Sequence, residues 1–318
     1  MNARAQLGSG RRARPLLTKD PVEAPGRASH SMNDADFKVR FWGTRGSLPV
    51  SGPEYARFGG NTACVEMQCG SHTLIFDAGS GIRSAGLQLM DAGVRDFDLF
   101  FTHCHYDHIV GLPFFAPLYR PGTRLAIWSG HLHGLMTTAE MLHSFMHPPW
   151  FPVELSICRA SLPARDFAPG DVLRPRPGVT IRTGNLNHPG GCIGYRVEFG
   201  GRVVALISDT EHRVDAPDQV VLSLIEDADL VIYDCTYTEA EMSIKRGFGH
   251  STWQEGVKLC EAADAHGLAL FHHDPSRTDS KLAALEAEAQ AAFPTAFAAF
   301  DGQALDIARR KRKVRRNA

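Results

Sequence analysis

The chain has 318 residues, a mass of 34.8 kDa and a net charge of −1, with 43% hydrophobic and 22% charged residues. These values are ordinary for a folded globular protein, so wholesale disorder is excluded. No run approaches the roughly 18 apolar residues of a membrane-spanning helix, and no apolar segment of a secretory signal follows the N-terminal arginines. Seven scattered cysteines without a CxxC pair are typical of reduced thiols. We therefore expect a cytoplasmic protein without a membrane partner.

The sequence predicts one folded domain between two tails. Residues 1–36 are rich in Arg, Ala, Gly, Pro and Ser, which predicts a disordered extension. Residues 37–308 show turn signals at short intervals and no long linker, as expected of a single domain. Residues 309–318 form a basic tail with seven cations, and removing these from the net charge of −1 leaves −8 for the rest. An acidic body favours divalent cations over long polyanions.

Short apolar or alternating runs predict strands in both halves of the domain. They cover residues 37–42, 63–68, 73–77 and 97–101 in the first half, and 192–199, 202–207, 230–234 and 268–272 in the second. A helix is predicted after Ser251, which would cap it in a capping box with Gln254. The apolar spacing of residues 282–293 predicts the last helix. Strands and helices mixed in this way predict an α/β fold in which helices cover sheets.

The strongest chemical signal is the run Thr-His-Cys-His-Tyr-Asp-His at residues 102–108, directly after a predicted strand. Residues two apart on an extended loop point to the same side, so His103 and His105 can bind one ion together. Asp107 and His108 are adjacent and diverge, so they can bind a second ion. Imidazole and carboxylate groups suit zinc, with manganese or iron as alternatives. The run therefore predicts a site for metal ions.

This HxHxDH loop resembles the hallmark of the metallo-β-lactamase superfamily, and later segments resemble its other motifs in the expected order. These segments are Asp77-Ala78-Gly79, Asn187-His188-Pro189, Ser208-Asp209-Thr210 and Leu270-Phe271-His272-His273. The resemblance spans about residues 37–305 and implies a four-layer αββα sandwich with two divalent metal ions, zinc being favoured. The implied ligands are His103, His105 and His188 for the first ion, Asp107, His108 and His272 for the second, and Asp209, with a hydroxide, bridging both. His273 remains a rival to His272 as the closing ligand.

Within the superfamily, the phosphodiesterase branch is the best match. Asp209 stands where the zinc β-lactamases carry Cys, and no helical domain of the glyoxalase II type follows His272. Residues 249–252 resemble the His-Ser-Thr motif of ribonuclease Z, a member of this branch along with the phosphoribosyl cyclic phosphodiesterases. The resemblance implies that Asp234 orients His250, which would donate a proton to the leaving group. The predicted catalytic residues are Asp107, His250 and Asp234, although His250 could instead only help to cap the helix.

Residues 130–152 form an insert that is long enough to cover the site. His131, His133, His143 and His147 in this insert are interpreted as surface or lid residues rather than as a third metal site. Phe145, Met146, Trp150 and Phe151 could contact a base or sugar, or could pack in the core.

The favoured function is a metal-dependent hydrolase, specifically a phosphodiesterase that uses a metal-bridging hydroxide on a small cyclic phosphodiester. A small substrate is favoured because the body is acidic and no basic arm for gripping tRNA is visible. Two alternatives remain open: an RNA-processing nuclease of the ribonuclease Z type that binds nucleic acid, and a metal-containing sensor module without turnover. Many relatives of this kind form homodimers, and the sequence leaves the oligomeric state open.

Overall fold

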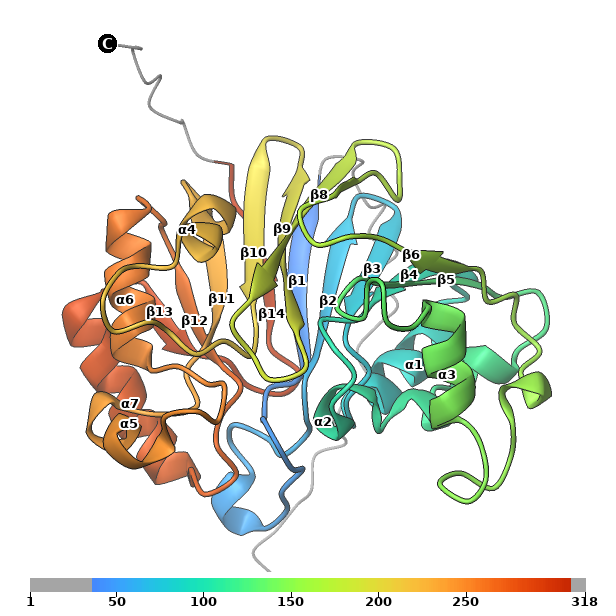
Figure 1. The fold of residues 1–318 in the computed structure, drawn as a ribbon, viewed down its shortest axis with the longest axis horizontal. Coiled ribbons are helices and arrows are strands. Elements are labelled where there is room, and N and C mark those ends of the chain that lie inside the picture. Colours follow the sequence, from blue (N-terminus) through green and yellow to red (C-terminus); the bar gives the residue numbers. More distant parts are fainter. Residues whose placement is uncertain (1–35, 310–318) are drawn as a thin grey trace, which may run out of the picture. The chain divides into compact units, whose positions relative to one another are not determined.

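The computed structural model describes residues 36–309, which contain fourteen strands and seven α-helices (Figure 1). The predicted extension (1–36) and the basic tail (309–318) lie outside the described residues, apart from Asp36 and Arg309. Among residues 36–309, no helix combines the length and the apolar character needed to cross a membrane.

The first sheet has seven strands in the order β14-β1-β2-β3-β4-β5-β6. The strands are β1 (Phe37–Gly43), β2 (Cys64–Cys69), β3 (His72–Phe76), β4 (Asp96–Phe100), β5 (Arg124–Ser129), β6 (Ala164–Asp166) and β14 (Ala304–Asp306). Pairing is antiparallel from β14 to β3 and parallel from β3 to β6. The carboxyl ends of β3, β4 and β5 therefore meet at one edge of this sheet.

The second sheet also has seven strands, in the order β13-β12-β11-β10-β9-β8-β7. The strands are β7 (Val172–Leu173), β8 (Val179–Leu186), β9 (Cys192–Phe199), β10 (Arg202–Ile207), β11 (Leu230–Asp234), β12 (Leu268–Phe271) and β13 (Ala296–Ala298). Pairing is antiparallel from β7 to β10 and parallel from β10 to β13. The carboxyl ends of β10, β11 and β12 thus also share an edge.

Three apolar cores produce the layering. Aromatic side chains from both sheets, among them Phe41, Phe76, Tyr195 and Phe271, fill the space between the sheets. A second core joins the outer face of the second sheet to α4 (Gln219–Ile225), α6 (Trp253–Ala262) and α7 (Asp279–Ala292), and a third joins the first sheet to α1 (Ile82–Asp91) and α3 (Thr138–Phe145). The remaining helices are α2 (Tyr106–Ile109) and α5 (Glu239–Lys245). The predicted four-layer αββα sandwich is confirmed.

The eight predicted strands are all present, with ends that agree to within one residue. The prediction that Ser251 caps the following helix was wrong, because the side chain of Thr252 accepts the hydrogen bond from the Glu255 amide. The Ser251 hydroxyl lies instead within 3.0 Å of both the Tyr233 hydroxyl and the His212 ring. Thr252 and Glu255 have the spacing of a capping box as well, so local sequence alone does not distinguish the two registers.

Candidate metal centre

Polar residues gather where parallel strands of both sheets end. Asp77 follows β3, Asp209 lies two residues after β10, and His272 follows β12. All three are buried and have a positive φ, of 62°, 38° and 60° respectively. Non-glycine residues adopt this conformation at a cost, and such residues cluster at functional sites. The strand ends therefore carry the candidate site.

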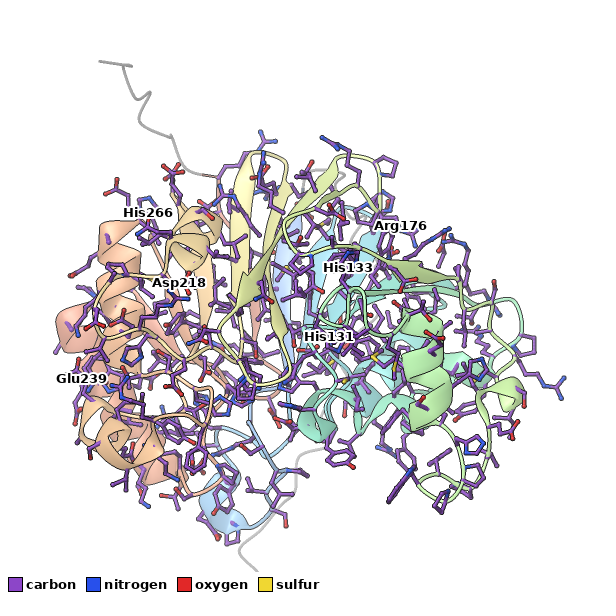
Figure 2. All side chains as sticks on the ribbon, viewed as in Figure 1. His131, His133, Arg176, Asp218, Glu239 and His266 are labelled. Atoms are coloured by element: carbon purple, nitrogen blue, oxygen red, sulfur yellow. The ribbon has the colours of Figure 1, made fainter. Side chains whose placement is uncertain are left out.

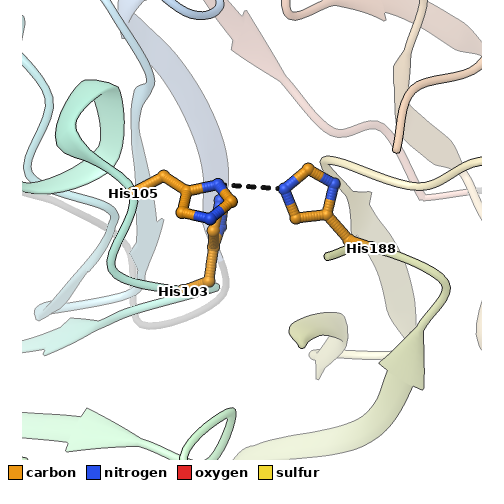
Figure 3. Close-up of side chains that lie close together, drawn as sticks. All are labelled: His103, His105 and His188. Carbon is orange, nitrogen blue, oxygen red and sulfur yellow. Dashed lines mark hydrogen bonds between the residues drawn. The ribbon is translucent and has the colours of Figure 1, made fainter. Parts of the chain in front are cut away.

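The first cluster consists of His103, His105 and His188 (Figure 3). The Nδ1 atom of His105 lies 3.0 Å from the Nε2 atom of His188, and one ring nitrogen from each of the three residues lies within 4.8 Å of the others. Burial lowers the pKa of all three rings, and nearby imidazoles lower it further. The rings are therefore held neutral, which is the form that binds a metal ion.

The second cluster consists of Asp107, His108, Asp209 and His272, whose ligand atoms also lie within 4.8 Å of one another. The Nε2 atom of His272 lies 3.1 Å from Asp107 Oδ2, and that of His108 lies 3.3 Å from the same oxygen. Burial of Asp107 opposes its charge, but His108 and His272 hold its pKa well below the usual range. The carboxylate is therefore charged and available to a cation.

Asp209 lies between the two clusters and directs one oxygen to each. Its Oδ2 atom lies 3.6 Å from His103 Nε2 and 3.7 Å from His188 Nε2 in the first cluster. Its Oδ1 atom lies 3.3 Å from His108 Nε2 and 3.2 Å from His272 Nε2 in the second. Burial opposes its charge as well, yet the pKa of Asp209 is held well below its usual range by His272 and His108. This is the arrangement of a carboxylate that can bridge two ions.

The donor set fits a pair of divalent ions. Its nitrogen and carboxylate oxygen atoms are the usual ligands of zinc. The Nε2 atom of His103 is buried and has no hydrogen-bond partner within the described part of the chain, which is unfavourable unless another ligand is present. A cation between the imidazoles of the first cluster would satisfy that nitrogen.

Asp77 contacts the ligand loop from the side opposite the metal-facing atoms. Its Oδ1 atom accepts a 2.7 Å hydrogen bond from the Thr102 amide, and its Oδ2 atom accepts one of 2.8 Å from the Thr102 hydroxyl. The Nδ1 atom of His108 donates to the same Oδ2 atom at 2.8 Å, which leaves Nε2 of that ring to face the second cluster. Such outer contacts fix the tautomer and orientation of a ligand.

His272, rather than His273, faces the cluster. The His273 ring packs edge-on against Phe58, and its Nε2 atom donates to the Ala299 carbonyl at 2.8 Å. Gly46 lies against the His272 ring so closely that a Cβ atom there would come within 2.1 Å of it. The Ser47 amide donates to Asp107 Oδ2 at 2.7 Å. The segment that follows β1 thus contacts two residues of the second cluster.

His250 lies beside the second cluster and contacts Asp234 at the end of β11. Its Nδ1 atom lies 3.0 Å from Asp234 Oδ2, which leaves Nε2 outside this contact. The other oxygen of Asp234 accepts hydrogen bonds from the amide and the hydroxyl of Thr236. Burial of His250 opposes protonation, but Asp234 and Asp209 outweigh this and raise its pKa to about 9. The Asp234 carboxylate therefore both orients the ring of His250 and favours its protonated form.

Glu211 is a site-supporting residue that the sequence did not suggest. Its Oε2 atom accepts hydrogen bonds from the amides of Gly247 and Gly249, at 2.7 and 3.0 Å. The Gly249 carbonyl in turn accepts a 2.8 Å hydrogen bond from His188 Nδ1, which leaves Nε2 of His188 for the first cluster. Gly249 has a φ of +83°, and a Cβ atom there would lie 2.4 Å from His188 Nδ1. Glu211 therefore orients both His188 and the loop that precedes His250.

Glu211→Ala is expected to weaken zinc binding by about 10–100-fold, the usual effect of losing a hydrogen bond that helps to orient a metal ligand. Glu211→Gln should lose less, because its amide oxygen can still accept from the loop. Competition with a chromophoric chelator measures the affinity, and Glu288→Ala, at an exposed position of α7, is the control. Wild-type affinity in Glu211→Ala would contradict the orienting role.

The histidines of the 130–152 insert only partly match their interpretation as surface or lid residues. His133, His143 and His147 are exposed, but His131 is buried and neither of its ring nitrogens has a hydrogen-bond partner within residues 36–309. Figure 2 labels His131 and His133 of this insert. None of the four belongs to a group with metal-ligand geometry in that range. Cys104, between two of the predicted ligands, is also outside those groups.

The comparisons with known proteins agree with this geometry. A family model described as the Beta-lactamase superfamily domain matches residues 72–273. Ribonuclease Z of Halobacterium salinarum is 25% identical in an alignment that covers 85% of this chain and 97% of the relative.

Two solved structures share the fold. The metallo-beta-lactamase fold protein YhfI from Bacillus subtilis superposes with a TM-score of 0.65 at 20% identity, covering 85% of this chain and 99% of its own. A diphosphatase from the PhnP family superposes with a TM-score of 0.60 at 17% identity, covering 85% and 97%. Because the family model spans more than half of the sequence, the chain belongs to the beta-lactamase superfamily domain family and is a metal-dependent hydrolase of the metallo-β-lactamase fold.

Proposed function

We propose that the protein is a phosphodiesterase that uses two divalent metal ions, with zinc favoured, on a small phosphodiester. The observation that carries the proposal is the placement of Asp209, whose two oxygens each face one cluster at 3.2–3.7 Å. His103, His105 and His188 would hold the first ion, and Asp107, His108 and His272 the second, with Asp209 shared between them.

Two ions held in this way would acidify water at neutral pH and would polarise a phosphoryl oxygen. The residues of the chain then have separate tasks. Asp77 and Glu211 keep the imidazoles in the orientation that presents the correct nitrogen. Asp234 holds Nδ1 of His250, so a proton on Nε2 can pass to the oxygen of the leaving group. This division needs no serine or cysteine nucleophile.

A phosphodiester is favoured by both the relatives and the residues. The names ribonuclease Z and diphosphatase each describe cleavage at phosphorus, and both proteins align along most of their length. The pair His250 and Asp234 offers a proton to a poor leaving group such as an alkoxide, which a phosphodiester releases. A small substrate is favoured over RNA because the chain without its basic tail carries a net charge of −8.

The metal-loaded protein is expected to hydrolyse bis(p-nitrophenyl) phosphate and to leave nitrocefin and a glutathione thioester intact. Activity on either of the latter two, with none on the phosphodiester, would contradict the proposal. The absorbance of the released p-nitrophenolate measures the rate.

RNA processing of the ribonuclease Z type is the second candidate, favoured by the alignment of ribonuclease Z over 85% of the chain. Binding of precursor tRNA should weaken steeply as salt rises, because many phosphate contacts release many counterions, whereas a single phosphodiester depends little on salt. Cleavage of precursor tRNA with that steep dependence would establish this candidate in place of the small substrate.

A further inference from the structure

A cavity of about 770 Å³ lies beside the ligand loop and is lined almost entirely by apolar and aromatic side chains. Its volume falls within the range of 300–1,000 Å³ that is typical of small-molecule sites. Tyr106, Val110, Phe114, Phe145, Trp150 and Phe151 are among its lining residues. None of the lining side chains carries a charge, so the cavity offers no cation to a phosphate group or to the backbone of RNA.

Two walls of this cavity belong to segments that carry or abut residues of the metal centre. One wall includes Cys104 and Tyr106, which alternate in the sequence with the ligands of the HxHxDH loop. The other wall includes Leu132, the neighbour of His131. A Cβ atom on Gly191 would lie 3.1 Å from the carbonyl oxygen of His131, so this wall abuts the turn that begins at His188. Both walls therefore place the cavity beside segments of the metal centre.

Several aromatic side chains of the cavity are exposed to solvent. Trp150 is 79% exposed, Tyr106 75% and Phe114 61%, and the ring of Phe114 meets that of Phe151 edge to face at 6.1 Å. A cluster of exposed apolar side chains of this kind marks a binding surface. These side chains would lose contact with water when an apolar group enters.

We infer that the cavity receives an apolar organic group of the substrate, so that the substrate class is an aryl or alkyl phosphodiester. This inference rests on the proposed function, and it adds that the ester group is recognised by burial rather than by hydrogen bonds. A second copy of the chain is the less favoured occupant. A stable protein interface buries about 800 Å² on each partner, whereas this feature is a concave cavity of small-molecule size whose walls belong to segments beside the metal centre.

The test uses the full-length, metal-loaded protein and a series of alkyl p-nitrophenyl phosphates in which the leaving group is constant and the alkyl chain grows from methyl to hexyl. Each methylene group that enters the cavity should raise kcat/KM about three- to fourfold. Trp150→Ala and Phe114→Ala should each reduce the hexyl-to-methyl ratio of kcat/KM several-fold. Ile244→Ala, which removes a 77% exposed apolar side chain from α5, is the matched control and should keep the ratio.

A second measurement separates this inference from the proposed function. Calorimetry compares the binding of hexylphosphonate and methylphosphonate, which needs no turnover. Hydrolysis of the methyl ester, with no rise in kcat/KM from methyl to hexyl, would contradict the inferred role of the cavity without contradicting the phosphodiesterase activity. Hexylphosphonate could instead bind more tightly than methylphosphonate, in a way that depends on Trp150, while no ester is hydrolysed. That result would support the inferred role of the cavity and contradict the phosphodiesterase activity. A dimer that Trp150→Ala converts to monomer, with an unchanged ratio, would assign the cavity to a second copy.

Discussion

Asp209→Ala should remove metal from both clusters and abolish turnover, the largest effect expected of any single substitution. Each oxygen of Asp209 faces a different cluster, so its loss takes one ligand from each ion. The loss of zinc affinity should exceed the roughly 10–100-fold loss that follows when a hydrogen bond orienting a metal ligand is removed. Metal content after dialysis, measured by elemental analysis, and the hydrolysis of bis(p-nitrophenyl) phosphate check both expectations.

Asp77→Ala is the matched control for this variant. It also removes a buried carboxylate at a strand end with a positive φ, but that carboxylate contacts Thr102 and His108 from behind the cluster. It should weaken metal binding by about 10–100-fold without emptying both sites. Circular dichroism shows whether each variant keeps its fold. Two bound ions in a folded Asp209→Ala protein would refute the bridging role.

His250→Ala is expected to slow hydrolysis by roughly 10²–10⁴-fold, the usual contribution of a general acid. The loss should be large with a simple alkyl leaving group and small with p-nitrophenolate, which leaves without protonation. Both metal ions should remain bound, and His250→Gln preserves bulk where the alanine variant fails to fold. An equal loss on both substrates would show that His250 binds the phosphoryl group instead. Loss of metal would make it a ligand, since it also lies in a group with Asp209, Asp234 and His272.

The same role predicts a dependence on pH. The donor needs the doubly protonated ring, and neighbouring carboxylates raise the pKa of His250 to about 9 against the effect of burial. Bound cations oppose protonation, so with the alkyl substrate the rate should fall as pH rises through 9 or somewhat below. Asp234→Asn removes a negative charge that favours the protonated ring, and should therefore move this fall to lower pH. An unchanged profile in Asp234→Asn would contradict the pairing.

The metal centre could be predicted from the sequence to the extent that its residues are local or end a strand. Four of its side chains lie within residues 103–108, where no long-range contact is needed to bring them together. The strands β9, β10 and β11 are apolar enough to be predicted with their observed ends. The short strands β6, β7, β13 and β14 were not predicted, because two or three residues carry no periodicity and their pairing depends on the rest of the sheet.

The remaining features depend on contacts between segments that are distant in sequence. Alternation along a strand leaves His272 and His273 equivalent, and the choice follows from a φ of 60° at His272 and from the approach of Gly46. Glu211 belongs to no motif, since its partners are backbone amides of a glycine loop. The cavity combines α2, α3 and the loop around Trp150, and no pattern in the sequence shows that they share one space.

The most direct test of the central claim is a zinc titration of metal-free protein, followed by the rate of bis(p-nitrophenyl) phosphate hydrolysis. Asp209 can be shared between two metal ions only when both are present, so the rate should rise until two equivalents of zinc per chain have bound and then stay constant. A rate that is complete at one equivalent, or a protein that binds two equivalents and hydrolyses no phosphodiester, would contradict the proposed two-metal phosphodiesterase.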